Sequence, residues 1–456
     1  MGGKRQKNRH WLASRREGWG EAPEAVCRGT EPSAANPSSE SQPSTQLMEE
    51  VTGSENMRLA WKRVKANKGS AGVDGMTIEA AADHLKAHWP AIREQLLAGM
   101  YRPQPVRRVE IPKPDGGVRK LGIPAVVDRV IQQAILQVLQ KRWDRTFSES
   151  SFGFRPGRSA HQAVAKAQSC IQEGFTWVVD LDLEKFFDRV NHDVLMARVA
   201  KRVSDQRLLK LIRGYLNAGV MENGLVSPTG KGTPQGGPLS PLLSNLLLDD
   251  LDKELERRGH KFVRYADDCN IYVRSERAGQ RVMEGVTRFL EVRLRLKVNQ
   301  QKSAVARPSQ RKFLGFSFTG GVKAKRRIAP KAILRLKERI RELTRRNRGV
   351  SVERMIKDLR RYLSGWRSYF GFCETPSVLE DLDGWIRRKL RCFLWKQWKR
   401  GRVRYRELTS RGVKSRLAAQ SAGSPKGPWR LSKSPALNIA LSNGWFASQG
   451  LPQLVP

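Results

Sequence analysis

Three aspartates in this sequence could together bind a metal ion. Asp267 and Asp268 are adjacent in "VRYADDCNIYV" (263–273), between short runs of β-branched and aromatic residues. Two neighbouring carboxylates repel each other unless a cation neutralises them, and Mg²⁺ is the hard cation that carboxylate oxygens bind well. Asp182 ends the apolar run "WVVDLD", 267 − 182 = 85 residues upstream. On adjacent strands the three would suit two-metal phosphoryl transfer.

Two other interpretations of these carboxylates remain open at this point. "YADD" taken alone could be a solvated acidic turn. Asp180 lies two positions before Asp182, on the same face of a strand, and is a rival third ligand.

The surrounding sequence predicts an α+β body that ends near residue 320. "VRRVEIPKPDGGVRKLGIP" (106–124) has the pattern of a β-hairpin with a Pro-Asp-Gly-Gly turn. Residues 176–188 begin as a buried strand and continue into a helix, and 234–249 form a Gly/Pro loop that leads into an apolar helix. The 263–273 stretch predicts two strands and a tight turn.

The net charge indicates a polyanionic partner. Lys and Arg number 85 and Asp and Glu 44, so the formal charge is +41. Phosphate backbones bind such surfaces through counterion release, whereas solubility alone needs only a small charge. The five cysteines are scattered without a C-x-x-C pair, which favours a reducing compartment over a disulfide framework. With no apolar run of membrane-spanning length, we expect a cytoplasmic, nucleoid-associated protein without a membrane partner.

The amino-acid composition before and after this α+β body differs from that of the body itself. Residues 1–52 include "EPSAANPSSESQPSTQ" and predict a disordered tail. Residues 321–400 are helical in pattern and hold 24 basic against 8 acidic residues, a net of +16. Aromatic residues interleave with those bases, and although some must be core, the combination suits RNA.

From about "AGVDGMT" (71–77) to the C-terminus, the sequence resembles the bacterial group II intron reverse transcriptase/maturase family in five ordered motifs. Four are typical of a reverse transcriptase, "IPKPDGGVRKLGIP", "DLEKFFD", "TPQGGPLSPLLSN" and "YADD". The fifth, "RRYLSGWRSYF" (360–370), is similar to the family's maturase domain. The resemblance implies a right-hand polymerase, with fingers and palm over 53–320 and a helical thumb/maturase region (domain X) over 321–400.

The family's catalytic roles carry over to matching positions as implications of the resemblance. Asp182, Asp267 and Asp268 would bind two Mg²⁺ ions with the Leu183 carbonyl, which leaves Asp180 structural. Lys302 would be a general acid for the leaving pyrophosphate, with Lys297 as a nearby alternative.

The resemblance also implies nucleotide and RNA contacts. Phe187 would be the steric gate against a ribose 2′-OH, although an aromatic there could be core. Lys113 and Arg119 would bind the triphosphate unless they are ordinary surface bases, and Gln235 would contact the nucleotide. The expected RNA contacts are Arg155, Arg158, Arg361, Trp366 and Arg367.

The predicted function is an RNA-directed DNA polymerase that binds its group II intron RNA, assists splicing and copies the intron into DNA during retrohoming. Its expected partners are that RNA, an RNA template with a DNA primer, target DNA and dNTPs. Residues 401–456 are expected to be a basic segment, a DNA-binding remnant without an endonuclease, because all six histidines lie at or before His260.

Two alternative functions stay open. One is a splicing-only maturase with a decayed polymerase site, against which the three retained aspartates argue. The other is the reverse transcriptase of a retron or diversity-generating element, which the long aromatic and basic C-terminal region disfavours.

Overall fold

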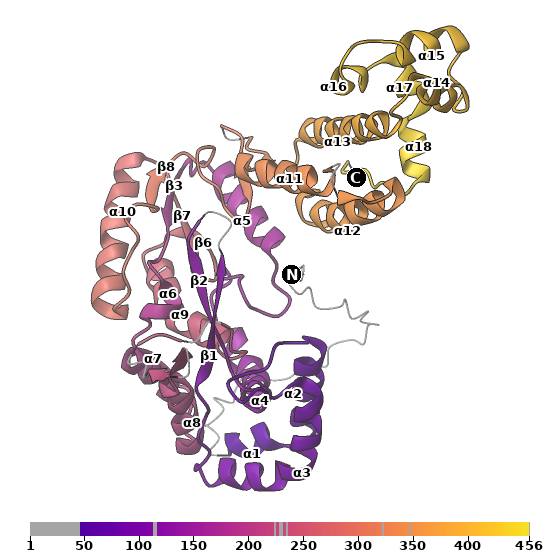
Figure 1. Cartoon of the computed structure of the whole chain (residues 1–456). Coiled ribbons are helices and arrows are strands. Elements are labelled where there is room, and N and C mark those ends of the chain that lie inside the picture. Colours follow the sequence, from indigo (N-terminus) through magenta and orange to yellow (C-terminus); the bar gives the residue numbers. More distant parts are fainter. Residues whose placement is uncertain are drawn as a thin grey trace, which may run out of the picture. The chain divides into compact units, whose positions relative to one another are not determined.

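A four-stranded antiparallel sheet forms the palm. The computed structural model describes residues 46–112, 116–222, 225–227, 231–233, 236–321, 323–345 and 348–455. The sheet has the order β6-β7-β3-β8 (Figure 1). Its strands are β3 (Trp177–Leu181), β6 (Lys261–Tyr265), β7 (Asp268–Val273) and β8 (Ala304–Ala306).

The two faces of this sheet are buried against different helices. Val179 and Leu181 of β3 and Ile271 of β7 belong to the main core, which also contains residues of α9 (Ser240–Arg257) and α10 (Glu276–Phe289). The alternate residues Val178 and Tyr272 pack in a second cluster with α5 (Ala160–Gln172). Because side chains alternate along a strand, Asp180, Asp182 and Asp268 fall on the α5 face.

A second four-stranded sheet, of order β2-β1-β4-β5, forms the fingers. The predicted hairpin is present as β1 (Val106–Pro112) and β2 (Val118–Ile123), paired antiparallel with Ile111 opposite Arg119. Strand β4 (Val220–Glu222) pairs parallel with β1, and β5 (Leu225–Ser227) pairs antiparallel with β4. The sequence had given no sign of β4 and β5.

Helices surround these sheets. The first four are α1 (Leu47–Thr52), α2 (Ser54–Ala66), α3 (Ile78–Leu97) and α4 (Val126–Trp143). Between β3 and β4 lie α6 (Phe186–Arg189), α7 (His192–Ala200) and α8 (Gln206–Asn217). Two short strands, β9 (Phe316–Phe318) and β10 (Arg326–Ile328), pair with each other after the palm.

The C-terminal region is helical with its own core. Its helices are α11 (Pro330–Leu343), α12 (Val352–Phe370), α13 (Pro376–Gln397), α14 (Gly401–Thr409), α15 (Ser415–Ala422), α16 (Pro428–Leu431), α17 (Pro435–Ala440) and α18 (Asn443–Ser448). One hydrophobic cluster runs from Ile328 to Leu454. Within the described residues, none of the helices is both long and apolar enough to cross a membrane.

Two domain limits expected from the sequence differ from what the structure shows. The tail was expected to reach residue 52, and its first 45 residues lie outside the described residues. However, Met48 and Val51 of α1 are fully buried, and the Met48 N–H donates to Asp205 at 3.0 Å. Residues 401–455 form helices that share the core of α12 and α13, and Asp383 of α13 accepts from the Leu454 N–H at 3.0 Å. A boundary at residue 400 therefore divides one packed unit.

Candidate active site

A tight turn carries the two adjacent aspartates. Tyr265 and Asp268 are the last pair of the β6–β7 ladder, so Ala266 and Asp267 alone connect the strands. Ala266 has φ +57°, a left-handed conformation that is uncommon for alanine. The turn therefore needs support from its neighbours.

Asp182 lies beside this turn. Strand β3 pairs antiparallel with β7, and Leu181 is opposite Cys269. Continuing that register by one residue places Asp182 opposite Asp268. The sequence prediction that two strands bring the three carboxylates to one edge of a sheet agrees with this geometry.

The carboxylates act on one another electrostatically. Desolvation by the surrounding protein raises the pKa of Asp268 to about 7, and the charges of Asp267, Asp180 and Asp182 add to the effect. Desolvation likewise raises the pKa of Asp267, with a further contribution from Asp182, while Arg119 and Arg264 lower it. The raised pKa values of Asp267 and Asp268 mean that the nearby positive charges do not offset the cost of burying these two carboxylates in their charged form.

Ion pairs separate the competing candidates for the third metal ligand and for the general acid. Arg311 forms an ion pair with Asp180 at 2.6 Å, so this carboxylate already has a cation. Lys302 Nζ lies 3.6 Å from Asp182 Oδ2, whereas Lys297 lies 3.7 Å from Glu184. Of the two lysines, Lys302 is the one beside the candidate metal ligand.

A buried arginine that the sequence did not reveal holds the aspartate turn. Arg264 of β6 is fully buried and forms a two-pronged ion pair with Asp252 of α9 at 2.5 and 2.7 Å. The same guanidinium donates to the Ala266 carbonyl at 2.9 Å, to Asn245 at 3.0 Å and to Ser151 at 2.7 Å. Only its place directly before "YADD" could have signalled this role.

Two of the four predicted nucleotide contacts, Arg119 and Phe187, lie among the residues that the structure describes. Arg119 is exposed on β2, near enough to Asp267 to lower its pKa. Phe187 is half-buried and packs edge-on against Phe186, and its carbonyl accepts from the Thr233 N–H at 2.7 Å. Thr233 is the last described residue before Gln235; Gln235 and Lys113 lie outside the described residues.

The first glycine after Gln235 lies where a side chain would meet the backbone, and the second lies against a side chain. A Cβ on Gly236 would lie 2.7 Å from the Gly122 carbonyl oxygen, and one on Gly237 would lie 2.6 Å from Gln132 Oε1. The backbone at Gly236 packs directly on the finger hairpin, as expected for a glycine that permits close approach, and Gly237 packs against the Gln132 side chain of α4.

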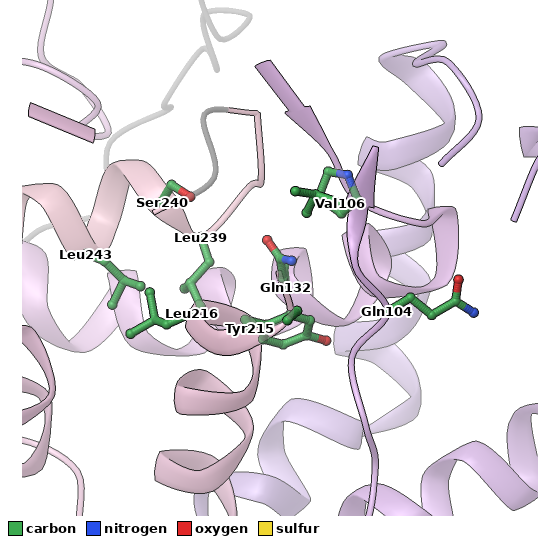
Figure 2. A pocket seen from close by; sticks show the side chains of 10 residues that line it. Gln104, Val106, Gln132, Tyr215, Leu216, Leu239, Ser240 and Leu243 are labelled. Atoms are coloured by element: carbon green, nitrogen blue, oxygen red, sulfur yellow. The ribbon is translucent and has the colours of Figure 1, made fainter. Parts of the chain in front are cut away.

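A small pocket lies where the fingers meet the palm. Figure 2 shows Gln132 of α4 between Val106 of β1 and Leu239 before α9, with Tyr215 of α8 below. Its lining contains no charged residue, so it is separate from the carboxylate site.

The donor set fits a divalent metal ion. In the described part of the chain, no three His, Cys, Asp or Glu side chains already form a metal cage. Mg²⁺ in phosphoryl-transfer sites is usually held by one or two carboxylates, with water and substrate phosphates completing its shell. Such an ion would offset the burial and the repulsion by neighbouring carboxylates that raise the pKa of Asp268.

The expected RNA contacts divide into buried and exposed residues. Arg155 has a side chain only 3 % exposed, paired with Asp144 at 2.9 Å and donating to the Ser148 and Ser151 carbonyls. Trp366 is likewise buried, in the C-terminal core. Both therefore hold the fold instead of touching RNA. The other three expected RNA contacts are not buried. Arg361 is exposed, and Arg158 and Arg367 are partly exposed; Arg158 also forms an ion pair with Glu149.

The fold and site together define a right-hand polymerase joined to a basic helical region. Residues 111–318 match the reverse transcriptase (RNA-dependent DNA polymerase) family, and residues 333–412 match the group II intron maturase-specific domain. This chain belongs to the group II intron reverse transcriptases and combines an RNA-directed DNA polymerase with a maturase domain for splicing. The family, the α+β fold and the enzyme class expected from the sequence are confirmed. Enzymes of this family use divalent metal ions and bind nucleic acids.

Individual relatives agree with this assignment. The chain is 32% identical over 314 residues to protein YkfC of Escherichia coli, covering 60% of this chain and 81% of YkfC. It is 29% identical over 324 residues to the group II intron-encoded protein LtrA of Lactococcus lactis subsp. cremoris, covering 57% of this chain and 54% of LtrA. A chain of a solved Cas6-RT-Cas1--Cas2 complex is 26% identical, covering 55% of this chain and 43% of its own length, with a TM-score of 0.35.

We predict that Arg264→Lys weakens the aspartate turn more than it weakens the fold. Lysine can keep a charge near Asp252 but cannot also reach the Ala266 carbonyl and Ser151, because it lacks the planar fork. We expect the free energy of unfolding to fall by about 2 kcal/mol and the Mg²⁺ concentration for half-maximal primer extension to rise about tenfold.

Asp252→Asn is the matched control for this prediction. It also disturbs the buried pair, but it leaves Arg264 free to donate to Ala266. An equal rise in the Mg²⁺ requirement for both variants would show that general loss of stability, and not the turn, is responsible.

We predict that Asp268→Asn stabilises the metal-free protein. The pKa of Asp268 is about 7 in the folded chain and about 3.9 in an unfolded one. An acid whose pKa rises on folding costs stability as pH increases from about 4 to about 7, and the full cost persists above that. In EDTA we expect Tm to rise by about 1–3 °C at pH 8 and by less at pH 5.

The exposed Asp83→Asn should leave Tm unchanged at both pH values, because the ion pair of Asp83 with Lys86 lies on the solvent-exposed surface of α3. A Tm gain for Asp268→Asn that is larger at pH 5 than at pH 8 would contradict the proposed cause.

Proposed function

We propose that this chain copies the group II intron RNA that it binds into DNA during retrohoming, by a two-metal nucleotidyl transfer. The observation that carries the proposal is the meeting of Asp182 with the Asp267–Asp268 turn at one end of the palm sheet. Its partners would be the intron RNA, an RNA template with a DNA primer, target DNA and dNTPs.

The aspartates would hold two Mg²⁺ ions, with the Leu183 carbonyl as a further ligand. These ions, when bound, supply the positive charge that activates a 3′ hydroxyl and stabilises the leaving pyrophosphate. The chain itself positions the ligands: Arg264 fixes the turn, and the Asp182 carbonyl accepts from the Asn299 N–H at 2.8 Å. Asp180 stays with Arg311 as a structural pair.

The residues around the carboxylates would select and orient the nucleotide. Lys113 and Arg119 would bind the triphosphate, and Gln235 would contact the nucleotide. Phe187 would exclude a ribose 2′-OH, which its half-buried position and fixed backbone support. Lys302, close to Asp182, would donate a proton to the pyrophosphate.

The helical region would bind the intron RNA. Lys337 and Arg341 of α11 and Lys389 of α13 all lie within 5.9 Å of the Trp385 ring centre. Lys389 also lies 5.6 Å from Trp429, over which Arg388 stacks at 3.8 Å. We call this group of four bases and two tryptophans the basic–indole surface. Cations and aromatic faces side by side suit phosphates and unstacked bases.

The remaining features of the proposal follow from the family. Arg158, Arg361 and Arg367 would make further RNA contacts, and residues 401–456 could contribute to DNA binding, with nine bases and one acid. We place the protein in the cytoplasm, in association with the nucleoid.

We predict that Asp267→Asn lowers primer extension on an RNA template by about a thousandfold or more, because a metal ligand is lost. Binding of the intron RNA and assistance of splicing should remain at the wild-type level, since the helical region is untouched. Extension by full-length protein is measured with Mg²⁺, with Asp193→Asn on α7 as the exposed control.

Two outcomes would count against the polymerase proposal. One is a wild-type protein that binds intron RNA but extends no primer, which would favour the splicing-only maturase. The other is full activity in Asp267→Asn.

We predict that Lys337→Gln, Arg341→Gln and Lys389→Gln together weaken intron RNA binding about tenfold at moderate salt. Each lost phosphate contact should also reduce the slope of log affinity against log salt by about 0.7–0.9. The control removes three positive charges from α10, which packs on the palm-sheet face opposite the aspartates. Its substitutions are Arg277→Gln, Arg281→Gln and Arg288→Gln. Equal losses in both triple variants would mean that net charge alone governs binding.

A further inference from the structure

A loop beside the aspartate turn is hydrogen-bonded to β6 and α9 through Ser150, Phe152 and Gly153. The Phe152 N–H donates to the Arg264 carbonyl and the Arg264 N–H to the Ser150 carbonyl, both at 2.9 Å. The Gly153 carbonyl accepts from Asn245 of α9 at 2.8 Å. A Cβ on Gly153 would lie only 2.3 Å from the Ala266 nitrogen, so the loop and the turn meet backbone to backbone.

Phe154 is the residue of this loop that the fold does not explain. It lies between buried Gly153 and buried Arg155, yet the residue itself is 40 % exposed. Its φ is +59°, in the left-handed region that disfavours a bulky side chain. The Phe154 carbonyl accepts from Gln140 of α4 at 3.3 Å, and Arg155 is anchored to Asp144, so both sides hold the residue in place.

Packing of the Phe154 side chain does not offset the conformational free energy that its left-handed backbone costs. A phenylalanine normally stabilises a protein by burying its ring, whereas Phe154 is one of the exposed large hydrophobic residues. Strained conformations that the surroundings enforce occur at ligand-contacting sites. The ring is therefore held ready for a partner that arrives next to Asp267.

We propose that Phe154 is a stacking platform for a base of the primer–template at the reacting end. This inference rests on the proposed polymerase function, which brings that end to the turn. A copying enzyme must accept every base in turn, and an aromatic face does so because each base has a π-face and stacking needs no sequence-specific hydrogen bond. Phe154 would thus position the nucleic acid without taking part in the chemistry.

The test compares three variants of the full chain, with primer–template affinity measured by fluorescence anisotropy and Tm by thermal unfolding. Phe154→Asn removes the ring, and asparagine tolerates a left-handed backbone. We expect its affinity to fall about five- to tenfold while Tm stays equal or rises. Phe154→Trp should stay within about twofold of the wild-type affinity, and Val292→Ala, at another exposed apolar site, should change nothing.

The substrate identifies which base is involved. Loss of affinity only with a template that extends beyond the primer indicates the unpaired template base, and loss with a blunt duplex as well indicates the terminal pair. Wild-type affinity in Phe154→Asn would overturn the proposal, as would equal weakening of the Asn and Trp variants with a lowered Tm.

The outcome is separable from that of the polymerase proposal. A wild-type protein that extends primers normally, with unaltered binding in Phe154→Asn, would remove the stacking role alone. Failure of the wild-type protein to extend a primer would count against the proposed polymerase function. The primer–template affinities of wild type and Phe154→Asn would still show whether Phe154 contacts the nucleic acid.

Discussion

The catalytic end of the palm depends on one buried ion pair, Arg264 with Asp252. The aspartate turn contains a left-handed alanine and two carboxylates that repel each other, so it does not stabilise itself. The guanidinium reaches the turn through the Ala266 carbonyl while Asp252 holds it to α9. Removing one partner of such a pair usually costs about 3–5 kcal/mol, because the other charge stays buried and uncompensated.

The same arginine connects three elements that are distant in the sequence. Its backbone pairs with the Ser150–Phe152 loop, and its side chain contacts Ser151 and Asn245. The loop in turn packs Gly153 against Ala266 and presents Phe154. The turn, the loop and α9 therefore act as one support, which fixes both the proposed metal ligands and the proposed base contact.

Charge is distributed in opposite ways over the molecule. Negative charge gathers at the carboxylates, where desolvation and mutual repulsion raise the pKa of Asp268 to about 7. Positive charge surrounds it, on the finger hairpin, at Lys302 and on the basic–indole surface, within a chain of net charge +41. The basic surfaces would attract a polyanionic substrate and bring it to the carboxylates. There, bound cations would be needed to make its approach favourable.

The sequence by itself determined the local chemistry and the broad architecture. The three aspartates, the finger hairpin, the strand before Asp182 and the helix after the glycine loop could be predicted, because alternation, turn residues and helical periodicity are local signals. Only the tertiary structure decided what depends on distant partners. It buries Arg155 against Asp144, pairs Arg264 with Asp252 and leaves Phe154 exposed in a strained conformation. It also includes residues up to Leu454 in the core of the maturase helices. Burial and pairing are properties of three-dimensional neighbours, and the residue types of Arg155 and Arg264 are the same whether they contact RNA or hold the fold.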